Sequence, residues 1–387
     1  MQTRIWKAKA PTPIIGSAML PKLTALPLPF TSPPLGLSEL HLLGRFSDFY
    51  AGAERELLDL QRLLSNRRSV HLWSEGGPHK SYASRGVETI QPFSHRFPKD
   101  GVLLIGGVHV RPGIWLKYTH FDRVIILYNL ASHGPLFALI ESIREATGLD
   151  PELVFPSHML LHSVGLPGKV LRSLIDLRDF LGTAAARAAK PAYSDARSFV
   201  VGRVSRDALD KHHPDDPALY RMLASQGVHL RIMGGTCLAP SLDGVQGIEL
   251  LPAGAEPVPI FYASLDAVFY RTGASIEAYG RVVAEAMASG LPVVAHRRGG
   301  YVEIIEHGHC GFLVYTQEQA FDTLMALRAS PELCAATGQN AVQKAFELHG
   351  SEAAESAVEF YCAEADSCCF WNTAEPEKYM PALPKPP

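Results

Sequence analysis

Short apolar runs alternate with longer helical patterns along most of the chain, and this alternation restricts the fold more than any other feature. Apolar runs occur at residues 38–44, 69–74, 101–107 and 123–129, and helical spacing of leucines and isoleucines occurs at 52–64 and 136–148. Continuous apolar runs are typical of strands that are covered on both faces, as in parallel sheets. The sequence therefore predicts an α/β fold with helices between the strands.

The same alternation starts again near residue 197. Strand-like runs lie at 198–203, 229–235, 266–271 and 291–295, and no internal sequence repeat is found. The 387 residues are enough for two domains, and an apolar content of 47% can supply a core for each. We therefore predict a disordered Pro-rich leader over 1–35, Rossmann-like domains over 36–195 and 196–350, and over 351–387 a helix that packs back on the first domain, followed by a disordered tail.

Charge, hydropathy and cysteine usage exclude several classes of protein. The formal net charge is −3, whereas nucleic-acid binding needs a basic surplus. No apolar run approaches the roughly 18 to 20 residues that span a bilayer, so we expect a soluble protein. The six cysteines form no CxxC pair and have no zinc spacing, which indicates reduced thiols in a cytoplasmic protein. The basic leader leaves open a contact with the inner face of the membrane.

Glycines, cations and carboxylates follow the strands of the second predicted sheet. The carboxyl ends of parallel strands meet at one edge, so we expect these residues to share a crevice: Gly202, Arg203, Lys211, Gly234, Glu277, Gly280, Gly299 and Gly300. Arginine can donate two hydrogen bonds to phosphate oxygens. Glycines at the start of a helix predicted over 301–308 would let backbone N–H groups reach an anion. Carboxylates accept hydrogen bonds from sugar hydroxyls. The set predicts a ligand with a diphosphate and vicinal hydroxyls, such as a sugar nucleotide.

Two glutamates, Glu277 and Glu285, stand on either side of a predicted helix start with seven residues between them. Two helical turns separate them by about 10 to 12 Å, which suits two ends of one ligand better than a proton-transfer pair. Two structural alternatives stay open at this point. Glu285 can pair with Arg281 on a solvated helix face, and Glu277 can be a loop acid near a helix N-terminus.

The stretch EAYGRVVAEAMASGLPVVA (277–295), followed by GGYVEIIEHGHCGFLV (299–314), resembles the hallmark of the retaining glycosyltransferases of family 4. VVGRVSRDALDK (200–211) resembles the loop that binds the donor diphosphate in that family, and GAER (52–55) resembles its first N-terminal helix. The resemblance is strong over about 198–315 and diffuse before that. It implies the GT-B fold, in which two Rossmann-like domains face a central cleft, with the acceptor on the first domain and the nucleotide sugar on the second.

The resemblance also assigns roles to residues. Arg203 and Lys211 would neutralise the leaving diphosphate, Glu277 would hold a hydroxyl of the transferred sugar, and Glu285 would accept hydrogen bonds from the ribose. The donor site would be completed by glycines: Gly202, Gly234, Gly280, Gly299 and Gly300. The spacing between Arg203 and Lys211 is longer than is usual in the family. The family's histidine at the end of the strand 123–129 is replaced by Tyr128 and Asn129, and the acceptor-side candidates are Gly52, His109, Asn129 and His133.

The resemblance implies transfer of a hexose, with retention of configuration, from a UDP- or GDP-linked donor to a sugar or lipid-linked acceptor in polysaccharide or glycoconjugate biosynthesis. The chain contains no Asp-x-Asp triplet, so we expect no metal and no cofactor besides the sugar nucleotide. Two alternatives remain. One is a sugar-nucleotide epimerase of the same architecture, and the other is a non-catalytic scaffold for a polysaccharide assembly system.

Overall fold

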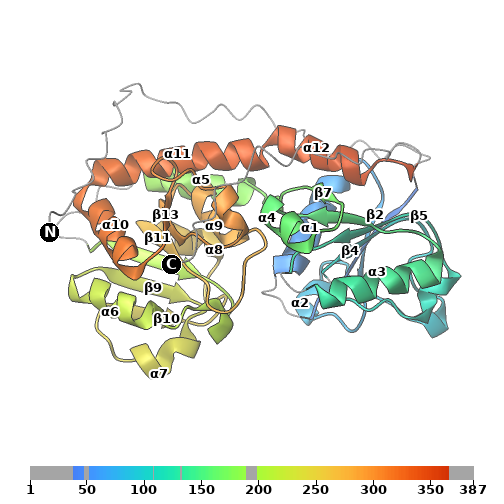
Figure 1. Cartoon of the computed structure of the whole chain (residues 1–387), viewed down its shortest axis with the longest axis horizontal. Helices are drawn as coiled ribbons and strands as arrows, with labels where there is room; N and C mark the ends of the chain where they lie inside the picture. Colours follow the sequence, from blue (N-terminus) through green and yellow to red (C-terminus); the bar gives the residue numbers. More distant parts are fainter. Residues whose placement is uncertain (1–37, 48–51, 108, 131–132, 189–197, 366–387) are drawn as a thin grey trace. The chain divides into compact units, whose positions relative to one another are not determined.

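The computed structural model describes residues 38–47, 52–107, 109–130, 133–188 and 198–365. Within these residues the chain forms two parallel β-sheets, and most of the strands within each are joined through helices (Figure 1). The predicted α/β class with two parallel sheets is thereby confirmed. The predicted leader over 1–35 lies outside the described residues, and the predicted domain boundaries stay predictions.

The first sheet has seven strands within the described residues, in the order β3-β2-β1-β4-β5-β6-β7. They are β1 (Leu40–Gly44), β2 (Val70–Ser74), β3 (Glu88–Thr89), β4 (Asp100–Gly106), β5 (His120–Leu127), β6 (Glu152–Phe155) and β7 (Lys169–Val170). The helices that accompany them are α1 (Gly52–Leu64), α2 (Lys80–Ala83), α3 (Gly134–Thr147) and α4 (His158–Val164), with the 3₁₀ helices η1 (Pro92–Ser94) and η2 (Ile114–Tyr118). The central strands β1, β4 and β5 consist mostly of buried apolar residues because helices cover both faces.

The second sheet has six strands within the described residues, in the order β10-β9-β8-β11-β12-β13. They are β8 (Val200–Val204), β9 (His229–Met233), β10 (Ile248–Leu251), β11 (Ala267–Tyr270), β12 (Val293–His296) and β13 (Phe312–Val314). The accompanying helices are α5 (Arg178–Ala188), α6 (Asp216–Ser225), α7 (Ala239–Leu242), α8 (Val258–Ser264), α9 (Arg281–Ala288), α10 (Gln317–Ala329) and α11 (Pro331–His349), with η3 (Leu209–Lys211), η4 (Thr236–Leu238) and η5 (Gly300–Glu303).

The prediction of a helix over 301–308 is wrong. The chain forms only the short 3₁₀ helix η5 there and then turns away. The N–H of Glu306 is taken by Cys310 Sγ at 3.2 Å, and His307 pairs with Gly311 in a β-bridge. These local partners compete with the hydrogen bonds of a helix, and they lead the chain into β13 instead.

The last described helix, α12 (Ser351–Tyr361), returns to the first sheet, as Figure 1 shows. Ala357 and Tyr361 are buried in a core cluster with side chains of β1, β2 and α1. The Nη1 of Arg123, on β5, donates to the carbonyl oxygens of Phe360 at 3.0 Å and Ala363 at 2.7 Å. The C-terminal part of the described chain is thus fixed to the first sheet by apolar packing and by a buried guanidinium.

In both sheets the strand order reverses beside the first strand, between β1 and β4 and between β8 and β11. Loops that leave such a point diverge to opposite faces of the sheet and leave a crevice at the carboxyl ends of the strands. No helix in the described part of the chain combines the length and the hydropathy that crossing a bilayer requires.

Candidate active site

A cavity of about 790 Å³ lies at the carboxyl ends of both sheets. The first sheet contributes residues that follow β1, β4 and β5, together with the start of α1. The second sheet contributes residues that follow β8, β10 and β11, together with the first turns of α9. Both reversal points of strand order therefore open into this one cavity.

Lys211 and Glu277 form an ion pair on the wall that the second sheet provides. Lys211 Nζ donates to Glu277 Oε1 at 2.6 Å, and the hydroxyl of Tyr270 donates to the same oxygen at 2.9 Å. Burial by itself would raise the pKa of the Glu277 carboxyl, but the Lys211 ammonium and these hydrogen bonds hold that pKa below its usual value. Glu277 is therefore ionised at neutral pH, next to a cation that also lines the cavity.

Glu285 lies on α9 and lines the same cavity with only 7% of its surface exposed. Burial raises the pKa of its carboxyl, although the nearby Arg281 and Arg55 oppose this shift. A carboxylate that is unfavourable to bury and lines a cavity is a candidate for ligand binding. The solvated helix face considered for Glu285 is not what the structure shows.

Arg281 reaches from the start of α9 across to the first half of the chain. Its Nη1 donates to Ser173 Oγ at 3.0 Å and to the Leu174 carbonyl at 2.7 Å, and its Nη2 pairs with Asp59 on α1. The first residue of α9 thus connects the helix that carries Glu285 to α1.

Gly299 and Gly300 allow two loops to pack closely rather than lining the cavity. The N–H of Gly300 donates to the Glu277 carbonyl at 2.8 Å. A Cβ at Gly300 would lie 2.0 Å from the Ala278 carbonyl oxygen, and Gly299 has a φ of 105° that favours glycine. These glycines therefore pack against the backbone of Glu277 and Ala278, and their predicted contact with a ligand stays a prediction.

Of the other three glycines predicted for the donor site, two are packed against neighbouring residues and one lines the cavity. A Cβ at Gly202 would lie 2.3 Å from Leu265 Cδ1, and one at Gly234 would lie 2.0 Å from the Ser205 carbonyl oxygen. Both are packing positions behind the cavity. Of the glycines predicted for the donor site, Gly280 is the one that lines the cavity in the described residues.

Arg203 lies behind the wall of the cavity and has no exposed surface. Its guanidinium donates to the carbonyl oxygens of Lys211 and Arg271, and its Nη1 lies 3.6 Å from Asp216 Oδ2. It is not among the described residues that line the cavity. The direct contact with a diphosphate that the resemblance implies for Arg203 therefore stays a prediction, which a fully buried guanidinium does not favour.

On the wall that the first sheet provides, three of the four predicted acceptor-side residues line the cavity. Gly52 begins α1, His109 follows β4, and Asn129 follows β5. His133 is at the N-cap of α3 and is not part of the lining. Of the two histidines that could substitute for the family's usual one, His109 lines the cavity and His133 does not, and the substitution itself stays a prediction.

Glu56 is a cavity residue that the sequence reasoning missed. It is 4% exposed, and burial raises the pKa of its carboxyl against the opposing effects of Arg281 and of hydrogen bonds from Ser173 and Asn129. A signal was present in the sequence, because Glu56 precedes Leu60 by four residues and so interrupts the apolar face of α1. A carboxylate on a buried helix face indicates either a structural ion pair or a site.

Residues 237–344 match the family model described as glycosyl transferases group 1. The chain is also similar to two sucrose synthases over short segments. The enzyme of Acidithiobacillus caldus is 48% identical over 65 residues, which cover 15% of this chain and 8% of the synthase. That of Solanum tuberosum is 52% identical over 50 residues, which cover 12% and 6%. The matched segments thus span less than a tenth of the length of either relative.

Solved structures are similar over most of the chain. Anabaena Alr3699/HepE in complex with UDP and glucose has a TM-score of 0.64 at 16% identity, covering 84% of this chain and 99% of that one. WaaG, a glycosyltransferase involved in lipopolysaccharide biosynthesis, has a TM-score of 0.59 at 15% identity, covering 83% and 99%. At these identities the likeness is one of fold. It confirms the predicted GT-B fold, and the match of residues 237–344 to the group 1 glycosyl transferases overlaps the stretch whose motifs resemble the retaining glycosyltransferases of family 4.

Proposed function

We propose that this protein is a retaining glycosyltransferase that moves a sugar from a nucleoside diphosphate to an acceptor hydroxyl. The observation that carries the proposal is the cavity that brings Lys211, Glu277 and Glu285 to one wall and Asn129 and His109 to the other. The fold shared with HepE, which was solved with UDP and glucose, supports a uridine diphosphate donor carrying a hexose.

The diphosphate would bind at the end of β8, where two cationic side chains line the cavity. Lys211 and Arg206 both line it from the loop after this strand, and Arg206 makes only a loose ion pair, 3.8 Å, with the equally exposed Asp210. Arg45 and Arg55 line the opposite wall. Fixed positive charges directed at a departing phosphate stabilise the negative charge that grows there in the transition state.

The sugar and the ribose would be held by the two carboxylates of the motif. Glu277 is ionised and would accept a hydrogen bond from a hydroxyl of the transferred sugar, and Glu285 would accept hydrogen bonds from the ribose. In the transfer step the bond from the anomeric carbon to the phosphate oxygen breaks and a bond to the acceptor oxygen forms on the same face. The proton of the acceptor hydroxyl passes to the departing diphosphate, so that charge and atoms balance.

The acceptor would enter from the side of the first sheet. Gly52, Glu56, His109 and Asn129 line that wall and offer one carboxylate, one amide and one imidazole to a hydroxyl-bearing ligand. A sugar or lipid-linked sugar of polysaccharide or glycoconjugate biosynthesis fits these groups. A contact of the protein with a membrane surface belongs to the same proposal.

Calorimetric titration with UDP-, GDP- and ADP-linked hexoses tests the proposal. We expect binding of a UDP-linked hexose, weakened at least tenfold in Lys211→Met and in Glu285→Ala, because each change removes a polar contact made to a charged ligand, worth about 1.5 to 3 kcal/mol. Lys344→Met is the matched control, since Lys344 pairs with Glu306 and Glu347 and does not line the cavity.

Turnover should show transfer or hydrolysis of the donor and should persist in EDTA, because side-chain cations take the place of a divalent ion. If Lys211→Met and Glu285→Ala both bound the UDP-linked hexose as tightly as the parent, the assignment of the donor site would be contradicted. Conversion of the donor to an epimer without an acceptor would contradict the transferase activity itself.

A further inference from the structure

We propose that Asp216, which lies outside the cavity, is a positioning residue for the diphosphate site and acts through Arg203 on Lys211 and Glu277. This inference rests on the proposed function. It assigns to the buried Asp216, Arg203 and Arg271 the task of positioning the residues that would bind the diphosphate.

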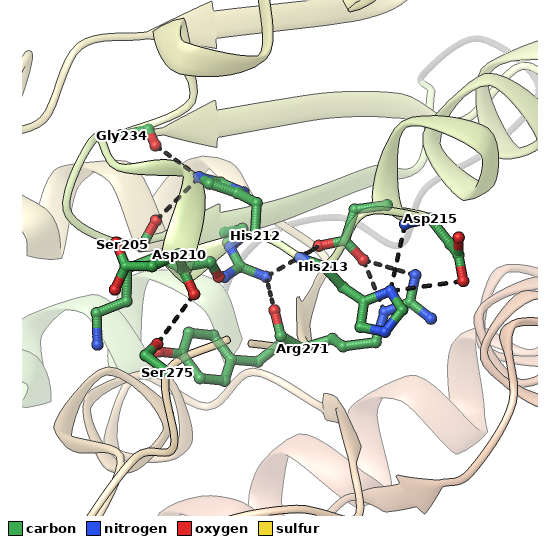
Figure 2. A network of polar contacts seen from close by, with 12 residues as sticks. Ser205, Asp210, His212, His213, Asp215, Gly234, Arg271 and Ser275 are labelled. Carbon is green, nitrogen blue, oxygen red and sulfur yellow. Dashed lines mark hydrogen bonds and ion pairs between the residues drawn. The ribbon is translucent and has the colours of Figure 1, made fainter. Parts of the chain in front are cut away.

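Asp216 has no exposed surface and binds two guanidinium groups. Arg271 Nε donates to Asp216 Oδ1 at 2.7 Å, and Arg203 Nη1 lies 3.6 Å from Oδ2. The backbone N–H of His213 donates to Oδ2 at 2.9 Å, which fixes the carboxylate at the start of α6. Figure 2 labels two members of this network: His213, in the loop before α6, and Arg271, directly after β11.

Arg203 links this carboxylate to the wall of the cavity in two ways. Its Nη2 donates to the carbonyl oxygen of Lys211, so it fixes the backbone of the residue whose ammonium reaches the cavity. Its guanidinium also lies over the ring of Tyr270, 4.8 Å from the centroid, and the hydroxyl of that ring donates to Glu277. One buried cation therefore contacts the supports of both members of the Lys211–Glu277 pair.

The loop that carries Lys211 is held from the other side as well. His212 Nε2 donates to the Gly234 carbonyl at 2.8 Å, and burial together with Arg203 lowers the pKa of His212 to about 4, so it stays neutral. Ser275 Oγ donates to the Asp210 carbonyl at 3.0 Å (Figure 2). Arg203 therefore holds the carbonyl of Lys211 between two neighbours that have partners of their own, and it is the contact in this loop that Asp216 can influence.

Loss of the Asp216 charge has two opposite expected effects on a bound diphosphate. If Asp216 acts only through its charge, the loss of that negative charge makes the site more positive and tightens the binding of an anion. If Asp216 instead acts by positioning, its loss deprives the two guanidinium groups of their shared partner inside the protein. They then move toward other acceptors and displace the backbone of Lys211, which weakens the binding of the diphosphate. The sign of the change in affinity therefore separates the two.

The test compares Asp216→Asn with Asp215→Asn, a change of the neighbouring, exposed carboxylate. Titrations measure the dissociation constants of UDP and of uridine, which lacks the diphosphate. We expect Asp216→Asn to weaken UDP at least tenfold and uridine less than twofold, and Asp215→Asn to change neither. A merely structural role would weaken both ligands alike, so the ratio of the two constants is the readout, with the melting temperature measured beside it.

Unchanged or tighter binding of UDP by folded Asp216→Asn would overturn the proposal, as would an equal loss of both ligands. If this variant does not fold, Asp216→Glu keeps the charge but moves the carboxylate, and parental UDP affinity there would overturn it too. A parent protein that binds no nucleoside diphosphate would instead overturn the proposed function, and this inference with it.

Discussion

At the scale of single residues, the two glutamates of one motif have opposite pKa shifts. The pKa of Glu277 is lowered, because Lys211 outweighs its burial, and the pKa of Glu285 is raised by burial. A lowered folded-state pKa contributes stability above the unfolded value of about 4.5, and that stability is lost as the pH falls through the folded value. A raised pKa means that ionisation of Glu285 destabilises the unliganded protein at neutral pH.

We therefore expect Glu277→Gln to lower the melting temperature at pH 7.5 by a few degrees and Glu285→Gln to raise it by a similar amount. The gain in Glu285→Gln should shrink as the pH falls toward 4.5, because the raised pKa of Glu285 means that its carboxyl is then protonated in the parent as well. The loss in Glu277→Gln should persist to about pH 4.5 and shrink only below it, as the pH falls through the lowered folded-state pKa. Melting curves of the three proteins between pH 4 and 8 check this. A Glu285→Gln variant less stable than the parent at pH 7.5 would show that its carboxylate is a structural ion-pair partner of Arg281 and Arg55.

At the scale of elements, the start of α9 depends on Gly280. This residue has a φ of 94°, and a Cβ there would lie 2.8 Å from Tyr301 Cβ. Gly244 has a similar φ of 73°, and a Cβ there would meet no atom of the described chain within 4 Å, so it isolates the cost of the backbone conformation. We expect Gly244→Ala to cost about 1 kcal/mol of unfolding free energy and Gly280→Ala clearly more.

Gly280→Ala should also weaken UDP binding, because a displaced α9 moves Arg281 and Glu285 together. Urea denaturation and UDP titration of both variants measure the two effects. Equal losses of stability in Gly280→Ala and Gly244→Ala would mean that the contact with Tyr301 relaxes without cost.

At the scale of the whole molecule, buried neutral histidines make the protein sensitive to acid. Burial lowers the pKa of His41 and His212 to about 4 and that of His349 to about 3, from an unfolded value of 6.5. Between pH 6.5 and 4 the unfolded chain binds protons that the native protein does not bind. Stability therefore falls with pH in this window, by up to about 1.4 kcal/mol per pH unit for each histidine.

His349→Gln should reduce the dependence of the unfolding free energy on pH by the contribution of one histidine. It also removes the contact of His349 Nε2 with the Tyr279 hydroxyl at 3.0 Å, so its stability at pH 7.5 should be lower. The exposed His309, changed to Gln, is the control. Urea denaturation at pH 7.5, 6.5, 5.5 and 4.5 gives the slopes, and a slope in His349→Gln equal to that of the parent would contradict the assignment of a buried neutral imidazole.

Much of the fold could be predicted from the sequence because it depends on local patterns. The helix predicted over 52–64 coincides with α1, and the eight predicted strands overlap strands of the two sheets. Five short strands, β3, β6, β7, β10 and β13, were not predicted. β3, β7 and β13 have only two or three residues, too few to show a pattern, and a glutamate shortens the apolar run in β6 and β10. The family resemblance came from residues close together in the chain, where a motif can be recognised without knowing the fold.

The sequence by itself determined the α/β class, the two sheets and the cavity positions of Lys211 and Glu277, since each of these residues follows a strand whose carboxyl end faces the crevice. Only the tertiary structure decided that Arg203 lies behind the cavity and that Glu56 lines it. The reason is that the direction of a long charged side chain depends on partners distant in the chain. Asp216 and the carbonyl of Arg271 hold Arg203 inside, and Ser173, Asn129 and Arg281 surround Glu56.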